Sequence, residues 1–124
     1  MENKSEQDKI VRLRGQDVIL DFAVAEIYEV ETKEINQVVR NNPRKFLYGY
    51  ILHLDVDEKR EVVKNFDRLD KLKYSSVLLK AFMEKGLYML ATILKGDKAI
   101  EATISIIEAF AKLRGMSRTI GEMS

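Results

Sequence analysis

The sequence contains no cysteine, no tryptophan, one histidine and one proline in 124 residues. The absence of cysteine excludes disulfides, zinc–thiolate sites and thiol nucleophiles. Long apolar runs are also missing, because the longest largely apolar stretch is residues 87–94, whereas a membrane-spanning helix needs about 20 residues. The polar start of the chain, Met1–Asp8, lacks the apolar segment of a signal peptide. We therefore expect a soluble, cytoplasmic protein that does not enter a membrane.

The overall charge does not indicate a particular kind of partner, since 21 Lys and Arg side chains against 20 Asp and Glu leave a net charge of +1. An electrostatic argument about partners must therefore rest on local clusters. The 46% of hydrophobic residues is enough for one ordinary core. We expect a single domain over residues 10–116, preceded by a disordered lead at residues 1–9 and followed by a frayed tail at residues 117–124.

Local patterns predict an α+β fold that is rich in helix. Residues 10–20 carry apolar side chains on both sides of Gly15, which indicates an N-terminal β-hairpin. Asp21 is expected to cap a short helix that ends near Tyr28. Thr32 is expected to cap a second helix, which runs to Asn42 and is stopped by Pro43. The chain therefore begins with a hairpin and two short consecutive helices.

The rest of the chain predicts one more short strand and three helices. Residues 46–54 are suited to a strand, or to a hairpin that turns at Gly49. Asp55 and Glu58 have the spacing of a reciprocal helix cap, and Val62, Phe66 and Leu69 would form the buried stripe of that helix. A short strand or an extended link is expected at residues 74–79, and the last two helices at residues 82–95 and 97–114, separated by Gly96.

The two short consecutive helices have the pattern of a helix-turn-helix, in which apolar residues fix the angle between the helices. The residues expected to face inward are Val24, Ala25, Tyr28, Val30, Ile35 and Val38. The outer face of the second helix then carries amide and basic groups, which can pair with bases and neutralise phosphates. The residues expected to contact double-stranded DNA are Thr32, Lys33, Asn36, Gln37, Arg40, Asn41, Arg44 and Lys45.

Two observations keep an alternative open. Short helix pairs with an apolar inner face occur in many proteins, and exposed Lys, Asn, Gln and Arg are ordinary surface residues. The turn often uses glycine for its positive φ, and Glu29 stands there instead. The alternative is a protein-interaction or dimerisation module with little affinity for DNA.

Catalysis is the interpretation that the sequence supports least. His53, the only histidine, lies in a strand-like run between two leucines, and no glycine-rich phosphate loop or nucleophile elbow is present. The carboxylates of Asp55, Asp57 and Glu58 are explained by helix capping without a metal ion. We expect no enzymatic activity, no catalytic residue, no metal, no cofactor and no small-molecule substrate.

The last helix has a wide apolar face that allows two interpretations. Ile100, Ile104 and Ile107 follow one another at steps of four and three residues, with further apolar residues alongside. The simpler interpretation places these isoleucines in the core. In the other, they pair with a second copy of the chain, and such a homodimer would present two recognition helices to DNA.

Two long segments resemble the phage domain family named for the N-terminal part of open reading frame six, a relative of the KilA-N and Bro-N domains. The segments are Val11–Phe46 (VRLRGQDVILDFAVAEIYEVETKEINQVVRNNPRKF) and Ala81–Met116 (AFMEKGLYMLATILKGDKAIEATISIIEAFAKLRGM). The resemblance covers residues 10–116. It implies a DNA-binding domain of the kind found in antirepressor-like proteins of phages and prophages, with its contacts on the second helix.

Matching positions are spread along both segments. In the first they are Arg14, Gly15, Gln16, Asp21, Ala25, Tyr28, Val30 to Lys33, Asn36, Val39, Arg40 and Asn41. In the second they are Phe82, Glu84, Gly86, Met89, Leu90, Ala99, Ile100, Ala109, Phe110 and Lys112 to Arg114. The sequence departs from the family at Glu29, which replaces a glycine, at Met83, which replaces a threonine, and at Leu79 and Lys80, which replace a proline–aromatic pair.

Overall fold

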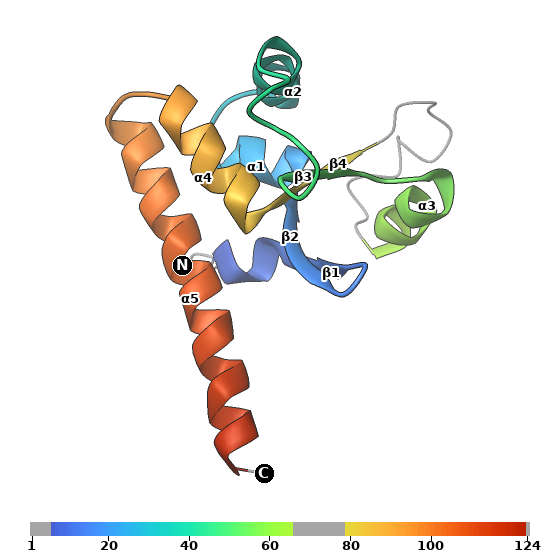
Figure 1. Cartoon of the computed structure of the whole chain (residues 1–124), viewed down its shortest axis with the longest axis vertical. Helices are drawn as coiled ribbons and strands as arrows, with labels where there is room; N and C mark the ends of the chain where they lie inside the picture. The colour runs from blue at the N-terminus through green and yellow to red at the C-terminus, as the bar shows by residue number, and fades with distance from the viewer. Residues whose placement is uncertain (1–5, 66–78, 124) are drawn as a thin grey trace.

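The computed structural model of the chain describes residues 6–65 and 79–123, and it has the α+β architecture that the sequence predicts (Figure 1). The elements are η1 (Glu6–Lys9), β1 (Ile10–Leu13), β2 (Gln16–Leu20), α1 (Asp21–Tyr28), α2 (Thr32–Asn41), β3 (Ile51–His53), α3 (Val56–Asn65), β4 (Lys80–Met83), α4 (Glu84–Ile93) and α5 (Asp97–Met123). The strands form one sheet in the order β1-β2-β4-β3, and all three neighbouring pairs are antiparallel.

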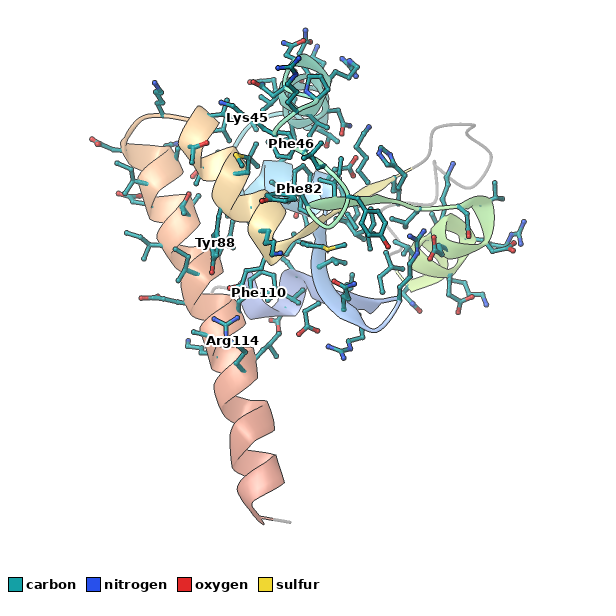
Figure 2. The ribbon with its side chains drawn as sticks, viewed as in Figure 1. Lys45, Phe46, Phe82, Tyr88, Phe110 and Arg114 are labelled. Carbon is teal, nitrogen blue, oxygen red and sulfur yellow. The ribbon has the colours of Figure 1, made fainter. Side chains whose placement is uncertain are left out.

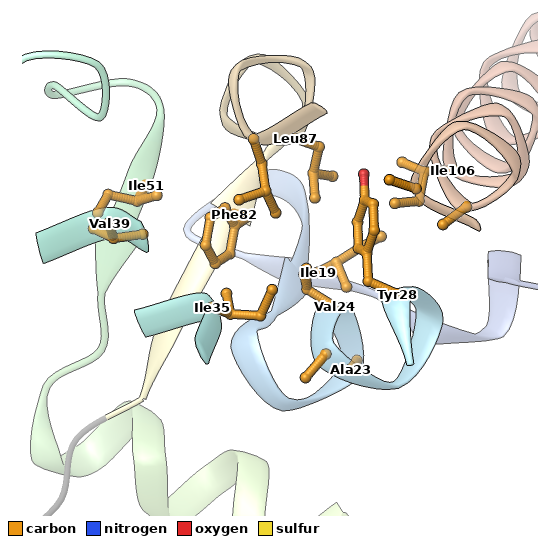
Figure 3. Close-up of a cluster of buried hydrophobic side chains, with 14 of the residues drawn as sticks. Ile19, Ala23, Val24, Tyr28, Ile35, Val39, Ile51, Phe82, Leu87 and Ile106 are labelled. Atoms are coloured by element: carbon orange, nitrogen blue, oxygen red, sulfur yellow. The ribbon is translucent and has the colours of Figure 1, made fainter. Parts of the chain in front are cut away.

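Side chains cover both faces of this sheet. The consecutive residues Val18, Ile19 and Leu20 of β2 are all buried, and they alternate between two apolar clusters as the pleat of a strand requires. Ile19 belongs to the larger cluster, which α1, α2, α4 and α5 complete (Figure 3). Val18 and Leu20 belong to the smaller cluster, against which Val62 of α3 packs. Helices thus cover both faces of a short sheet.

The N-terminal hairpin is confirmed, and its turn consists of Arg14 and Gly15. Both residues have positive φ, 53° and 76°, which is the geometry that two-residue hairpin turns prefer. The Arg14 side chain extends to the start of α3. It donates to both carboxylate oxygens of Glu58 at 2.7 Å, and to the carbonyl oxygen of His53 at 3.0 Å. This contact joins the hairpin turn to α3.

The cap predicted for α3 is also confirmed. The Asp55 N–H donates to Glu58 Oε1 at 2.9 Å, and the Glu58 N–H donates to Asp55 Oδ1 at 2.8 Å. Val62 is partly buried, whereas Phe66 and Leu69 lie outside the described residues. The hydrogen bond from Arg14, together with that from the backbone of Asp55, lowers the pKa of Glu58 from 4.5 to about 2.

Because the folded-state pKa of Glu58 lies below its unfolded value, this contribution to stability is fully present above pH 4.5 and is lost as the pH falls towards 2. Glu58→Gln is expected to lower the free energy of unfolding at pH 7 by about 1 kcal/mol, since solvent screens the pair. The difference from wild type should shrink towards zero near pH 2. Urea unfolding at several pH values measures it. Glu61→Gln, which removes a looser pair with Lys64 on the same helix, is the control, and a deficit for Glu58→Gln that does not vary with pH would contradict the assignment.

Residues 80–83 form a strand, although the sequence predicted that a helix begins at Phe82. β4 lies in the interior of the sheet, where Phe82 stands opposite Ile19 of β2 and Ile51 of β3. The helix begins only at Glu84, after Met83 at the N-cap. The short strand or link predicted at residues 74–79 falls almost entirely outside the described residues. The strand or hairpin predicted at residues 46–54 is reduced to Ile51–His53, preceded by a turn in which Gly49 has a φ of 95°.

The two ends of the domain are more regular than the sequence predicted. Residues 6–9, expected to be disordered, form the short helix η1, which packs against α5. The expected frayed tail at residues 117–124 is helical as far as Met123, and α5 extends well beyond the rest of the fold (Figure 1). The simpler prediction for Ile100, Ile104 and Ile107 is wrong, because all three side chains are exposed. The buried stripe of α5 is instead formed by Ala99, Ala102, Ile106, Ala109 and Phe110.

Candidate nucleic-acid interface

The turn between α1 and α2 has the geometry that the helix-turn-helix pattern requires. Glu29 ends α1 in the left-handed region, with φ 59° and ψ 42°, where glycine would be unstrained. The Val30 N–H donates to the carbonyl oxygen of Ala25 at 3.0 Å and closes the turn. The Glu29 carboxylate pairs with Lys98 Nζ of α5 at 2.5 Å. The strained residue is thereby connected to the last helix.

The start of α2 differs by one residue from the prediction. Glu31 is the N-cap, with Thr32 as the first helical residue, and the Glu31 N–H donates to Glu34 Oε1 at 3.4 Å. At the other end, Asn42 Nδ2 donates to the carbonyl oxygen of Val38 at 2.8 Å, just before Pro43. Both ends of this ten-residue helix therefore have hydrogen-bond partners.

The inner side of α2 is apolar, as predicted. Ile35 is fully buried and Val39 is nearly so, and both lie with Val24 of α1 and Phe82 of β4 in the larger cluster (Figure 3). Val38 is partly buried against the same cluster. The orientation of α2 is thus fixed by aliphatic packing, which leaves its opposite side to solvent.

The outer side of α2 carries most of the residues predicted to contact DNA. Lys33, Gln37 and Arg40 follow one another at steps of four and three residues, so they share one face of the helix, and all three are exposed. Asn41, Arg44 and Lys45 are exposed as well, while Thr32 is partly buried at the helix start. Figure 1 shows α2 at the top of the view, at one edge of the domain, and Lys45 is labelled in Figure 2.

Asn36 does not lie on that exposed face, so its predicted orientation is wrong. Its Nδ2 donates to Oδ2 of Asp21 at 3.2 Å, and its Oδ1 is buried without a hydrogen-bond partner. Asp21 was expected to cap α1, yet Leu20 is the N-cap and the Asp21 side chain is buried beneath α2. Burial raises the pKa of Asp21, and the hydrogen bond from Asn36 opposes that shift. Asn36 therefore positions α2 on α1.

The pairing of the arginines separates this surface from the rest of the described chain. Of the six arginines whose side chains the structure describes, four form ion pairs, at 2.7 to 3.0 Å: Arg12 with Asp17, Arg14 with Glu58, Arg60 with Asp57 and Arg114 with Glu84. The side chains of Arg40 and Arg44 have no ion pair or hydrogen bond with any described residue, and neither has that of Lys45. Lys33 has a loose, exposed pair with Glu31 at 3.4 Å. Two unpaired arginines thus lie on α2 and the loop that follows it, together with the unpaired Lys45.

Other kinds of site receive no support from the described part of the chain. Within residues 6–65 and 79–123, no group of three or more His, Asp or Glu side chains is placed to hold a metal ion. No helix in these segments is both long enough and apolar enough to cross a membrane.

Comparison with known proteins gives one match. The model of the ORF6N domain family matches residues 8–93, which include the hairpin, the α1–α2 pair, the rest of the sheet and α4. The match ends before α5, whereas the sequence resemblance was expected to continue to residue 116. No curated protein and no solved structure matches the chain. Since the family model covers more than half of the sequence, the chain belongs to the ORF6N family of phage-associated domains.

Proposed function

We propose that this domain binds double-stranded DNA through the outer side of α2 and the loop that follows it. The proposed setting is transcription control by a phage or prophage in the bacterial cytoplasm, in an antirepressor-like role. Membership of a phage-associated family is consistent with that setting. The proposal includes no enzymatic step and no cofactor.

The observation that carries the proposal is the pairing of the arginines, which leaves Arg40 and Arg44 unpaired. Among the arginines whose side chains the structure describes, Arg40 and Arg44 are the two without a carboxylate partner, and Lys45, next to Arg44 in the chain, has none either. An unpaired guanidinium can bind phosphate or guanine without first losing an internal ion pair. The nearly neutral chain therefore offers duplex DNA a surface on which two unpaired arginines and an unpaired lysine lie together.

The residues divide into two expected roles. Gln37 and Arg40 lie on the outer face of α2, where an amide and a guanidinium can read adenine and guanine in the major groove. Lys33, Arg44 and Lys45 lie at the two ends of this surface and are expected to contact phosphates. The remaining predicted contacts, Thr32 and Asn41, lie at the ends of α2. Asn36 acts through Asp21 as a positioning residue.

Binding should depend steeply on salt, because each phosphate contact releases condensed counterions. Four cations on this surface set a limit of about −3.6 for the slope of log K against log salt concentration, from about −0.9 per contact. Fluorescence anisotropy with a labelled duplex, starting at about 50 mM salt, measures this slope. Binding with a slope between about −2 and −3.6 is expected. No binding at the lowest salt concentration, or binding that does not respond to salt, would contradict the proposal and favour a protein-interaction module.

A further inference from the structure

Asp21 and Asn36 form a buried polar pair where α2 packs on α1 (Figure 1). Asp21, at the start of α1, is 2% exposed. Asn36 Nδ2 donates to Asp21 Oδ2 at 3.2 Å, and the other oxygen of each group is buried without a hydrogen-bond partner. In the part of the chain whose side chains the structure describes, these two oxygens are the buried side-chain polar atoms that lack a partner. Both unsatisfied atoms therefore belong to one pair of bonded side chains.

The chemistry of the two groups indicates what the pair lacks. An ionised carboxylate and an amide oxygen are acceptors only, and a buried acceptor without a donor destabilises the fold. A protonated carboxyl, in contrast, has one O–H donor. A proton on Asp21 Oδ1 that is donated to Asn36 Oδ1 would give both oxygens a partner at once. The carboxylic acid and the amide would then be joined by two hydrogen bonds, one in each direction.

We propose that Asp21 keeps a proton on Oδ1 in the folded domain and donates it to Asn36 Oδ1, so that a two-point acid–amide pair holds α2 on α1. Burial is the largest influence on the carboxyl and raises the pKa of Asp21, because the charged form loses its hydration. The charged side chain with the strongest effect is that of Lys80 on β4, whereas α2 contributes the neutral amide of Asn36 and β2 the apolar Leu20. Lys80, Asn36 and the backbone of Phe22 favour the ionised form but do not cancel the effect of burial.

The pair makes the attachment of α2 sensitive to pH. Because the folded-state pKa of Asp21 lies above its unfolded value, this contribution to stability is fully present below pH 3.8 and is lost as the pH rises through the folded-state pKa. Loss of the proton leaves the hydrogen bond from Asn36 Nδ2 and two oxygens without a donor. Gln37 follows Asn36 directly and Arg40 lies one turn further on, so the orientation of the face proposed to contact DNA would respond to pH. This consequence rests on the proposed function, whereas the acid–amide pair itself does not.

A pH titration of the full chain, labelled with carbon-13 at its aspartate carboxyls and followed by NMR, tests the proton. The Asp21 carboxyl signal, assigned through its backbone, is expected to titrate with a midpoint above 3.8, the ordinary value for an aspartate. The side-chain amide signals of Asn36 should move with the same midpoint, because the two groups share the proton. A midpoint at or below 3.8, or amide signals that do not follow the titration of Asp21, would overturn the proposal. The titration uses no DNA, so its outcome is independent of whether the domain binds DNA.

The variant Asp21→Asn tests the same pair through stability, since an amide N–H takes the place of the carboxyl proton in a side chain of nearly the same shape. This donor is not lost on titration, so the urea midpoint of Asp21→Asn should rise relative to that of the wild type as the pH increases from about 4 to 8. The control is Asp17→Asn on β2, where the carboxylate is paired with Arg12 at 2.9 Å, and its removal should give no such gain. A difference between Asp21→Asn and the wild type that stays constant or falls with rising pH would contradict the acid–amide pair.

Discussion

Gly86→Ala is expected to lower the free energy of unfolding by about 3 kcal/mol, the upper part of the range for overpacked sites. A Cβ at Gly86 would lie 2.1 Å from the carbonyl oxygen of Tyr50 and 3.0 Å from its carbonyl carbon. That oxygen accepts the Met83 N–H at 3.0 Å, so the backbone cannot withdraw without breaking a bond at the junction of β4 and α4. The loss of stability should come from poorer packing of α4 against the segment that precedes β3.

Chemical denaturation followed by circular dichroism measures this effect. Gly115→Ala is the matched control, since Gly115 is also helical and a Cβ there would meet nothing within 4 Å. The control should be neutral, or more stable by up to about 1 kcal/mol from helix propensity. Equal stability of the two variants would contradict the close approach of α4 to the backbone of Tyr50.

Those parts of the fold that depend on local signals could be predicted from the sequence. The hairpin around Gly15 and the reciprocal cap of Asp55 and Glu58 depend on residues that are near one another in the chain. β4 could not be predicted in this way, because Phe82 and Met83 continue the apolar pattern of the following helix. What makes them a strand is pairing with residues 18–20 and 51–53, which are distant in sequence.

In the candidate site, too, some residues could be placed from the sequence and others could not. Periodicity placed Lys33, Gln37 and Arg40 on the exposed side of α2, because Ile35 and Val38 identify its buried side. Asn36 borders that buried stripe, and only the position of Asp21 decides that its amide faces inward. No sequence spacing identifies Asp21 as its partner. On α5 both stripes are apolar, so the packing of α1 and α4 had to be known before the exposed stripe could be recognised.

The double substitution Arg40→Ala/Arg44→Ala is expected to weaken binding to duplex DNA at least about 40-fold at about 0.1 M salt. Loss of the phosphate contact of Arg44 contributes roughly eightfold, and loss of the guanine contact of Arg40, worth about 1 to 3 kcal/mol, contributes at least about fivefold. Neither side chain has an ion pair in the described protein, so the domain should fold with unchanged stability. The control, Arg12→Ala/Arg60→Ala, removes the same charge from two exposed arginines that are already paired with Asp17 and Asp57. It should change affinity by much less, and an equal loss in both proteins would show that only the overall charge matters.

The outer side of α2 is tested most directly by the salt dependence of these two double variants, compared with that of the unmodified chain. Because Arg44 is expected to contact a phosphate and Arg40 a base, the slope of log K against log salt concentration should become shallower by about 0.9 for Arg40→Ala/Arg44→Ala and stay unchanged for Arg12→Ala/Arg60→Ala. Three identical slopes would place the DNA, if it binds, on another surface of the molecule.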